Sequence, residues 1–152
     1  KVFCFDVNIS NFKYHSKNIE VFGVDINNTK KIINILRKIF NNHNFKNFDL
    51  IIDDGSHQLS DILYSLKFFF KYLKKDGLFV IEDYKHPNYY KYNNDIDHIL
   101  VDELLKNLKE KRNFKSSLFT NDDQLYFFGK ISKIETYEGN LNDSNICFIK
   151  KS

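Results

Sequence analysis

Apolar positions along this chain fall into short runs typical of strands, separated by longer stretches with a helical repeat. The strand-like runs occupy residues 1–7, 19–26, 48–52, 78–82, 126–139 and 145–151. The runs at 48–52 and 78–82 are continuously apolar, which predicts strands buried on both faces. The last two runs predict a pair of strands joined by a polar turn near residues 140–145.

In the intervening stretches, apolar residues recur every three or four positions, which predicts amphipathic helices. These stretches are 29–41, 58–74 and 95–110. Either Asn28 or Thr29 is suited to cap the first of these helices. The pair Asp76–Gly77 predicts a turn between the second helix and the strand that follows it.

This alternation predicts an α/β fold, namely a doubly wound Rossmann-like sheet that ends in a C-terminal antiparallel hairpin. A chain of 152 residues suits one domain, and we expect residues 1–152 to form it. Ligands of such sheets bind at the carboxyl ends of the parallel strands. The acidic residues that close the apolar runs at this edge are Asp6, Asp25, Asp53, Asp54, Glu82 and Asp83.

Charge and composition argue against several classes of protein. A formal net charge of +3, from 23 basic and 20 acidic residues, gives no case for nucleic-acid binding. No apolar run approaches the roughly 18 residues of a membrane helix, and residues 1–7 read as a strand rather than a signal peptide. Cys4 and Cys147 lie in strand-like runs without metal-binding spacing, which favours reduced, buried thiols in a cytoplasmic protein. A homo-oligomer is compatible with such a domain.

Two acidic clusters follow consecutive strands. Asp54 lies in "FDLIIDDGSH", and Glu82 and Asp83 lie in "LFVIEDY", with one predicted crossover helix between the two strands. If these strands are neighbours, about 4.8 Å apart, the three carboxylates face one another and repel. A hard divalent cation would relieve this repulsion, and oxygen ligands favour Mg²⁺ over zinc. His57, three residues after Asp54, is placed to accept the proton of a bound hydroxyl.

Simpler interpretations stay open for each of these residues. Asp53 or Ser56 could cap the following helix, an acidic pair at a strand end could lie only at the surface, and a histidine in a turn is often solvated. Asp25 could stabilise the N-terminus of the helix at 29–41. The metal site is favoured because both acidic clusters follow consecutive strands at the same predicted edge.

The motif "FDLIIDDGSH" followed by "IEDY", with 28 residues from Asp54 to Glu82, resembles a family. It is similar to the metal-dependent class I S-adenosylmethionine (SAM) O-methyltransferases that act on sugars, the macrolide-sugar O-methyltransferase and cephalosporin-hydroxylase-like group. The resemblance implies that Asp54, Glu82 and Asp83 hold Mg²⁺ and that His57 is the general base. The implied reaction is methyl transfer from SAM to a sugar hydroxyl of a glycan or glycosylated metabolite.

The sequence departs from this family at its start, because its five glycines form no GxGxG loop to hold the methionine end of the cofactor. Two registers are therefore considered. In the favoured one, 1–7 is the second strand, Asp6 binds the cofactor ribose, and the first strand and its loop lie upstream; the absence of methionine agrees with such an N-terminally incomplete chain. In the other register, 1–7 is a glycine-less first strand and Asp25 binds the ribose. The predicted cofactor contacts are Asp6, Asp25, Ile26, Asn27 and Asp53.

Residues 85–94 are rich in aromatic and amide side chains, and a loop there would overhang the site. The predicted substrate contacts are Tyr84, Tyr89, Tyr90 and Tyr92, with His86 as a weaker candidate. The basic stretch 106–117 reads as a solvated helix end, with binding of a phosphorylated or nucleotide-linked sugar as the alternative. Two other functions remain open: a metal-dependent hydrolase or hydroxylase-like enzyme on the same carboxylates, and a non-catalytic Rossmann-like binding module.

Overall fold

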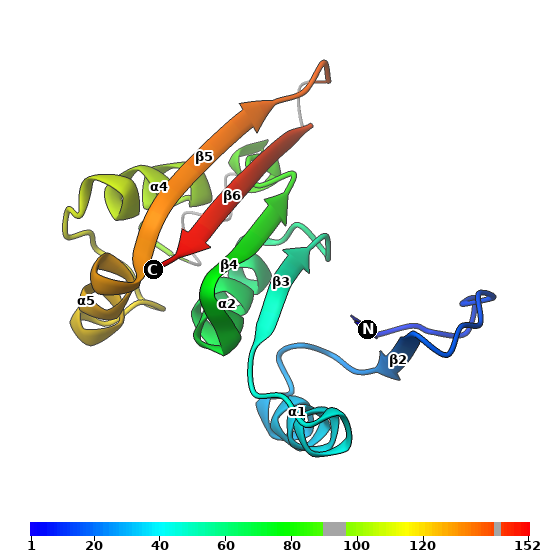
Figure 1. The fold of residues 1–152 in the computed structure, drawn as a ribbon. Helices are drawn as coiled ribbons and strands as arrows, with labels where there is room; N and C mark the ends of the chain where they lie inside the picture. The colour runs from blue at the N-terminus through cyan, green and yellow to red at the C-terminus, as the bar shows by residue number, and fades with distance from the viewer. Residues whose placement is uncertain (90–96, 142–143) are drawn as a thin grey trace. The chain divides into compact units, whose positions relative to one another are not determined.

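The computed structural model describes residues 1–89, 97–141 and 144–152. Tyr90 and Tyr92, two predicted substrate contacts, lie outside these ranges. The chain falls into two compact units, Lys1–Lys46 and Asn47–Ser152 (Figure 1). Within the described residues, no helix is both long enough and apolar enough to cross a bilayer. The single-domain organisation of 1–152 stays a prediction.

The first unit contains two parallel strands and one helix. β1 (Val2–Asp6) pairs with β2 (Ile19–Gly23), and α1 (Thr29–His43) follows. The side chain of Asn28 accepts a hydrogen bond from the backbone N–H of Lys31, so Asn28 caps α1 as the sequence predicts. The helix ends at His43 and is followed by Asn44 in the left-handed conformation.

The second unit is built on a mixed four-stranded sheet. Its elements are β3 (Phe48–Asp53), α2 (Leu59–Phe69), η1 (Phe70–Tyr72), β4 (Leu73–Glu82), η2 (His86–Tyr89), α4 (Val101–Glu110), α5 (Asn121–Lys130), β5 (Ile131–Glu138) and β6 (Asn145–Lys151). The strand order is β3-β4-β6-β5, with β3 and β4 parallel and the other pairs antiparallel. The predicted C-terminal hairpin is therefore confirmed as β5 and β6.

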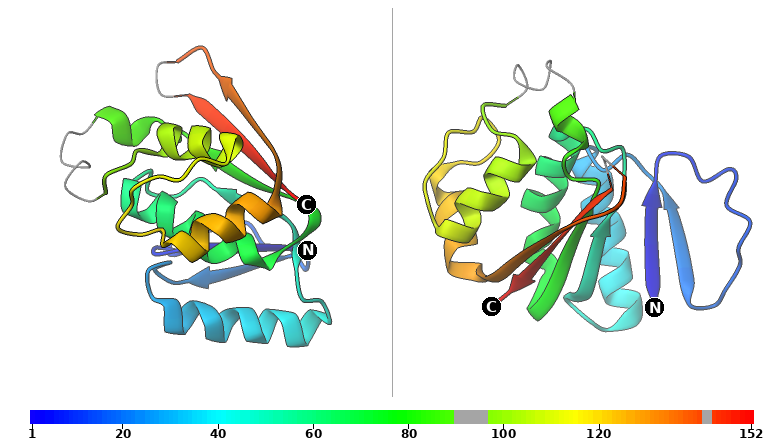
Figure 2. Two further views of the ribbon diagram at one scale, coloured as in Figure 1. Left: turned by 90° about the vertical axis from the view of Figure 1, so that its left-hand side faces the viewer. Right: turned by 90° about the horizontal axis from the view of Figure 1, so that it is seen from above.

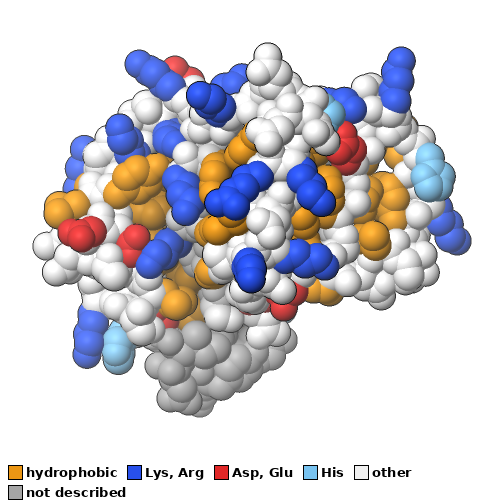
Figure 3. All heavy atoms as spheres, turned by 90° about the horizontal axis from the view of Figure 1, so that it is seen from below, with side chains coloured by type: hydrophobic (Ala, Val, Ile, Leu, Met, Phe, Trp, Pro, Cys, Tyr) orange, Lys and Arg blue, Asp and Glu red, His pale blue; other side chains and the backbone are white. Residues whose placement is uncertain are grey.

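Helices α2, α4 and α5 lie on one side of this sheet (Figure 2). The strand residues that face the helices form the core: Phe79, Ile81, Ile134, Cys147 and Ile149, each at most 4% exposed. On the opposite face, Leu50 is 49% exposed and Ile52 is 55% exposed. Hydrophobic side chains also reach the surface on the side drawn in Figure 3, where lysines and arginines lie between them.

The expectation that 48–52 is buried on both faces is wrong. β3 pairs only with β4 among the described strands, and none of the described helices of the second unit covers the face that carries Leu50 and Ile52. A continuous apolar run therefore does not distinguish a central strand from an edge strand whose second face is left uncovered.

The boundary between α2 and β4 also differs from the prediction. The helix ends at Phe69, and β4 begins at Leu73, before the predicted Asp76–Gly77 turn. Asp76 has a φ of 63°, and the pairing of β3 with β4 shifts register between Phe48 and Leu50. The turn signal thus marks an irregularity inside a long strand rather than its start.

Two further boundaries were misplaced. Residues 126–130 are helical and belong to α5, because Thr120 and Asp123 form a capping box that starts a helix just before them. The predicted helix at 95–110 is found as α4 from Val101, while residues 95–96 lie outside the described ranges.

The strand pairing agrees with the favoured register of the sequence. In a doubly wound sheet of order 3-2-1-4-5, the first strand separates the second from the fourth. Here β1 pairs with β2 in the first unit, as the second and third strands of that order do, and β3 pairs with β4 in the second unit, as the fourth and fifth do. Within each unit, the parallel pairing is that of a Rossmann-like sheet.

Candidate functional site

The acidic edge of the second unit follows from the register of its two parallel strands. Asp53 at the end of β3 lies opposite Ile81, one residue before the end of β4. Asp54 and Asp83, the residues that follow the two strands, therefore leave the sheet at the same edge, as the sequence predicts. Both strands are held in place by α2, the crossover between them.

His57 lies close to both of these carboxylates. Its Nε2 is 3.8 Å from Oδ1 of Asp54 and 4.0 Å from Oδ2 of Asp83. The side chain of Asp54 is 62% exposed and that of Asp83 is 40% exposed, whereas His57 is 24% exposed. The arrangement gives two solvent-accessible oxygen donors beside one imidazole.

Two of these three residues have backbones in the left-handed region. His57 has a φ of 55° and Asp83 a φ of 48°. Residues with a β-carbon adopt this region at some conformational cost, although aspartate and histidine are among those found there. Strained residues of this kind are enriched at functional sites, which is an observation independent of the sequence motif.

Each turn is held by its own hydrogen bonds. In the first, Ser56 Oγ donates to Asp61 Oδ2 at 2.6 Å and accepts from the backbone N–H of Gln58 at 3.2 Å. Because α2 begins after Gln58, neither Asp53 nor Ser56 occupies its N-cap position. The simpler interpretation of these residues as helix caps therefore does not account for them.

The second turn is attached to its surroundings on two sides. Lys85 forms an ion pair with Glu138 on β5, and Asn88 Nδ2 donates to Asp102 Oδ2 on α4 at 3.1 Å. Hydrogen bonding to Glu138 raises the pKa of Lys85 and lowers that of Glu138. These contacts fix the turn that carries Asp83.

Asp53 lies beneath the first turn. Burial raises the pKa of its carboxyl, although hydrogen bonds from Ser65 and from the backbone N–H of Gly55 act in the opposite direction. Its Oδ2 is buried and has no hydrogen-bond donor among the described residues. A buried acceptor without a donor is unusual, so this oxygen is suited to accept a hydrogen bond from a ligand.

Glu82 is not brought into a complete metal site. It is the half-buried last residue of β4, paired with Ile146 of β6. Across the described residues, no three histidine, cysteine or acidic side chains are arranged to hold a metal ion. The structure thus brings together Asp54, His57 and Asp83, and the role of Glu82 stays a prediction.

The predicted cofactor residues of the first unit lie at the carboxyl ends of its two strands. Asp6 closes β1 opposite Gly23, the last residue of β2, and its Oδ1 accepts a hydrogen bond from the backbone N–H of Asn8. Asp25 Oδ1 accepts one from the backbone N–H of Asn27. Ile26 lies between these two residues, so all four occupy the expected edge of this sheet.

The aromatic candidates divide into two groups. Tyr84 is 3% exposed and hydrogen-bonded to Thr136, so its prediction as a sugar contact is wrong: it packs in the core. Tyr89 is 57% exposed and stays a candidate. His86, a weak candidate in the sequence, contacts His57 directly. No spacing rule in the sequence links these two histidines.

Solved structures with a similar fold are known. Solved structures of the MycE methyltransferase from the mycinamycin biosynthetic pathway are similar to the chain. One, in complex with Mg and SAH, has a TM-score of 0.67 at 21% sequence identity and covers 98% of this chain and 36% of that chain. A second, in complex with Mg, SAH and mycinamycin VI, has the same TM-score at 22% identity. This chain has a methyltransferase fold.

The similarity concerns the fold and only part of the larger protein. The chain spans 36% of the length of the MycE chains that it matches. No model of a known protein family matches the sequence, and no curated protein matches it. The fold nevertheless agrees with the resemblance that the motifs indicate.

Proposed function

We propose that this chain is the catalytic part of a SAM- and Mg²⁺-dependent O-methyltransferase that acts on a sugar hydroxyl of a glycan or glycosylated metabolite. The observation that carries the proposal is the proximity of the Asp54 and Asp83 carboxylates to His57 Nε2, at 3.8 and 4.0 Å. The similar structures of MycE contain Mg and SAH, the demethylated product of SAM, and one also contains a macrolide.

Carboxylate oxygens are the type of donor that a hard cation prefers, although the described side chains do not form a complete metal site. Asp54 and Asp83 present exposed carboxylate oxygens, and Glu82 is the neighbour that would complete an all-oxygen set. When bound, Mg²⁺ would lower the pKa of a coordinated hydroxyl, and SAM would supply the methyl group as a sulfonium. Cofactor contacts are proposed for Asp6, Asp25, Ile26 and Asn27 in the first unit and for the unpaired Oδ2 of Asp53 in the second.

The chain's own contribution to the reaction centres on one imidazole. His57 Nε2 is the nitrogen that faces the two carboxylates, so it is the atom that would take the proton from the acceptor hydroxyl. The neighbouring carboxylates would then stabilise the positive charge that develops on the ring. The fixed turns hold this geometry before the substrate arrives, which favours reaction by orientation.

The first test is ligand-dependent thermal stability of the chain with Mg²⁺ and S-adenosylhomocysteine, singly and together. A ligand at a hundredfold excess over its Kd stabilises the folded state by about 2.7 kcal/mol, and a chain of this size should then melt roughly 5–10 °C higher. Asp54→Ala should abolish the Mg²⁺-dependent part. Asp49→Ala is the matched control, because Asp49 lies at the opposite end of β3 and is 82% exposed in its side chain.

Each outcome decides between functions. A joint shift that Asp54→Ala loses supports the methyltransferase, and radiolabelled SAM with a panel of glycosides then identifies the acceptor. A metal shift without a cofactor shift favours a different metal-dependent enzyme on the same carboxylates. No shift with either ligand contradicts the enzymatic proposal and leaves a binding module.

A further inference from the structure

The strongest unassigned feature of the second unit is the contact between its two histidines. His86 Nδ1 lies 3.3 Å from the carbonyl oxygen of His57, and the two ring centroids are 5.8 Å apart. A carbonyl oxygen only accepts hydrogen bonds, so His86 must carry its proton on Nδ1 to make this contact.

We propose that His86 is a positioning residue that ties the two acidic turns together and so holds His57 beside Asp54 and Asp83. This proposal rests on the proposed function, since the site that it organises is the methyl-transfer site. His86 contacts both turns: its backbone N–H donates to the carbonyl oxygen of Asp83 at 2.8 Å, and its ring donates to His57.

The tie acts at the strained position of the site. His57 has a φ of 55°, and a hydrogen bond to its carbonyl oxygen stabilises the peptide plane that follows this residue. Without the bond, the turn is free to relax toward an ordinary conformation, which would move the imidazole away from the carboxylates. His86 would thus act on the reaction through His57.

The element that carries His86 is well anchored. Pro87 is buried, and the neighbouring Asn88 side chain donates to Asp102 on α4 at 3.1 Å. The short helix η2 (His86–Tyr89) therefore offers a fixed base from which the imidazole reaches the β3 turn. Partners outside the ligand shell commonly change metal affinity by tenfold or more when they are removed.

A pair of variants separates the hydrogen bond from simple packing. His86→Asn keeps a donor near the position of Nδ1, whereas His86→Phe keeps a ring but removes the donor. His98→Phe is the control, because His98 is an exposed histidine of the same unit. Melting in EDTA shows whether each full-length variant folds.

The first readout needs no metal. The backbone carbonyl ¹³C resonance of His57 should shift in His86→Phe and stay near its wild-type position in His86→Asn and His98→Phe. The second readout is Mn²⁺ affinity by water-proton relaxation, which should fall about tenfold in His86→Phe and less than about threefold in His86→Asn.

If the His57 carbonyl resonance shifts in both His86→Asn and His86→Phe, or in neither, the proposed hydrogen-bond tie is wrong. If His86→Phe does not fold, His86→Asn decides alone: a wild-type His57 resonance and Mn²⁺ affinity support the tie, and loss of both contradicts it. If the wild-type chain binds no Mn²⁺, the proposed function fails, while the carbonyl resonance still tests the tie.

Discussion

The ammonium nitrogen of Lys151 lies 2.8 Å from the carbonyl oxygen of Leu73, so the last strand is tied to the start of β4. It also donates to the carbonyl oxygens of Phe70 and Lys71, at 3.2 and 3.0 Å. These carbonyls follow α2, and the Phe70 carbonyl also accepts a hydrogen bond from the backbone N–H of Leu73. Lys151 is 9% exposed, and burial lowers the pKa of its ammonium group.

Lys151→Met should lower the free energy of unfolding by about 2 kcal/mol, because the carbonyl oxygens of Phe70, Lys71 and Leu73 each lose the hydrogen bond from the Lys151 ammonium group. Lys150→Met is the matched control. Lys150 is 42% exposed in its side chain and pairs with Asp76 at the surface, so its loss should change stability by less than about 0.5 kcal/mol. Urea unfolding measures both. Equal effects would show that the Lys151 bonds add nothing to stability.

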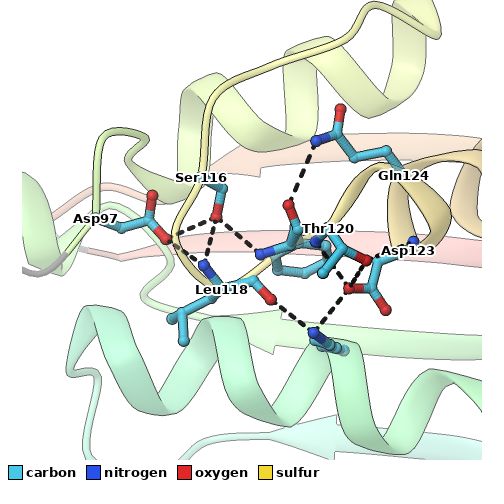
Figure 4. A network of polar contacts seen from close by, with 8 residues as sticks. Asp97, Ser116, Leu118, Thr120, Asp123 and Gln124 are labelled. Carbon is cyan, nitrogen blue, oxygen red and sulfur yellow. Dashed lines mark hydrogen bonds and ion pairs between the residues drawn. The ribbon is translucent and has the colours of Figure 1, made fainter.

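Asp97 organises the loop between α4 and α5 (Figure 4). It is 3% exposed and accepts hydrogen bonds from the Ser116 hydroxyl at 2.7 Å and from the backbone N–H of Leu118 at 3.2 Å. Asp97→Asn replaces one acceptor oxygen by a donor and should reduce stability by about 2 kcal/mol. The exposed Asp122→Asn is the control. Faster amide exchange at Leu118 in Asp97→Asn alone would confirm the local cause; unchanged exchange would contradict it.

The start of α5 should give the fold a pH-dependent contribution. Burial acts to raise the pKa of Asp123, but hydrogen bonds from Lys67 and Thr120 outweigh it, and the pKa is lowered from 3.8. A lowered pKa of a carboxyl stabilises the folded state above the unfolded-state pKa, and this contribution disappears as the pH falls through the folded-state pKa.

Asp123→Asn should therefore be less stable than wild type by about 1 kcal/mol at pH 7. The difference should shrink as the pH falls below about 4, because the wild-type carboxyl then takes up its proton. Urea unfolding at several pH values, from about 2.5 to about 7, measures this difference in unfolding free energy. A difference independent of pH would assign the loss to geometry rather than charge.

The two thiols should react very differently. Burial raises the pKa of Cys147 to about 12, whereas Cys4 is half-buried. At pH near 8, a thiol reagent should label Cys4 in the folded chain and reach Cys147 only after denaturation, because the thiolate is the reactive form. Cys4→Ser should abolish the native labelling. Rapid labelling of this variant would show that β6 opens readily.

The sequence predicted those features that depend on local pattern. Apolar runs located β3 and β4, and their acidic ends correctly predicted that Asp54 and Asp83 share an edge. The capping box at Thr120 was present in the sequence, but the apolar residues after it read equally well as a strand.

Other features depend on tertiary context and could not be predicted. Exposure of Leu50 follows from which strands pair beside β3, and burial of Tyr84 follows from its packing in the core. The left-handed backbone of His57 and its contact with His86 arise where two turns meet. The periodicity of apolar residues carries no information about contacts between turns that are distant in the sequence.

The positive φ angles of His57 and Asp83 place two residues with a β-carbon in a conformation that favours glycine. Glycine adopts these conformations freely, whereas a residue with a β-carbon is disfavoured there by about 1 kcal/mol. A protein optimised for stability alone would therefore carry glycine at both positions. If His57→Gly and Asp83→Gly melt at a higher temperature than wild type in the absence of ligands, the imidazole and carboxylate of the site lower the stability of the folded state.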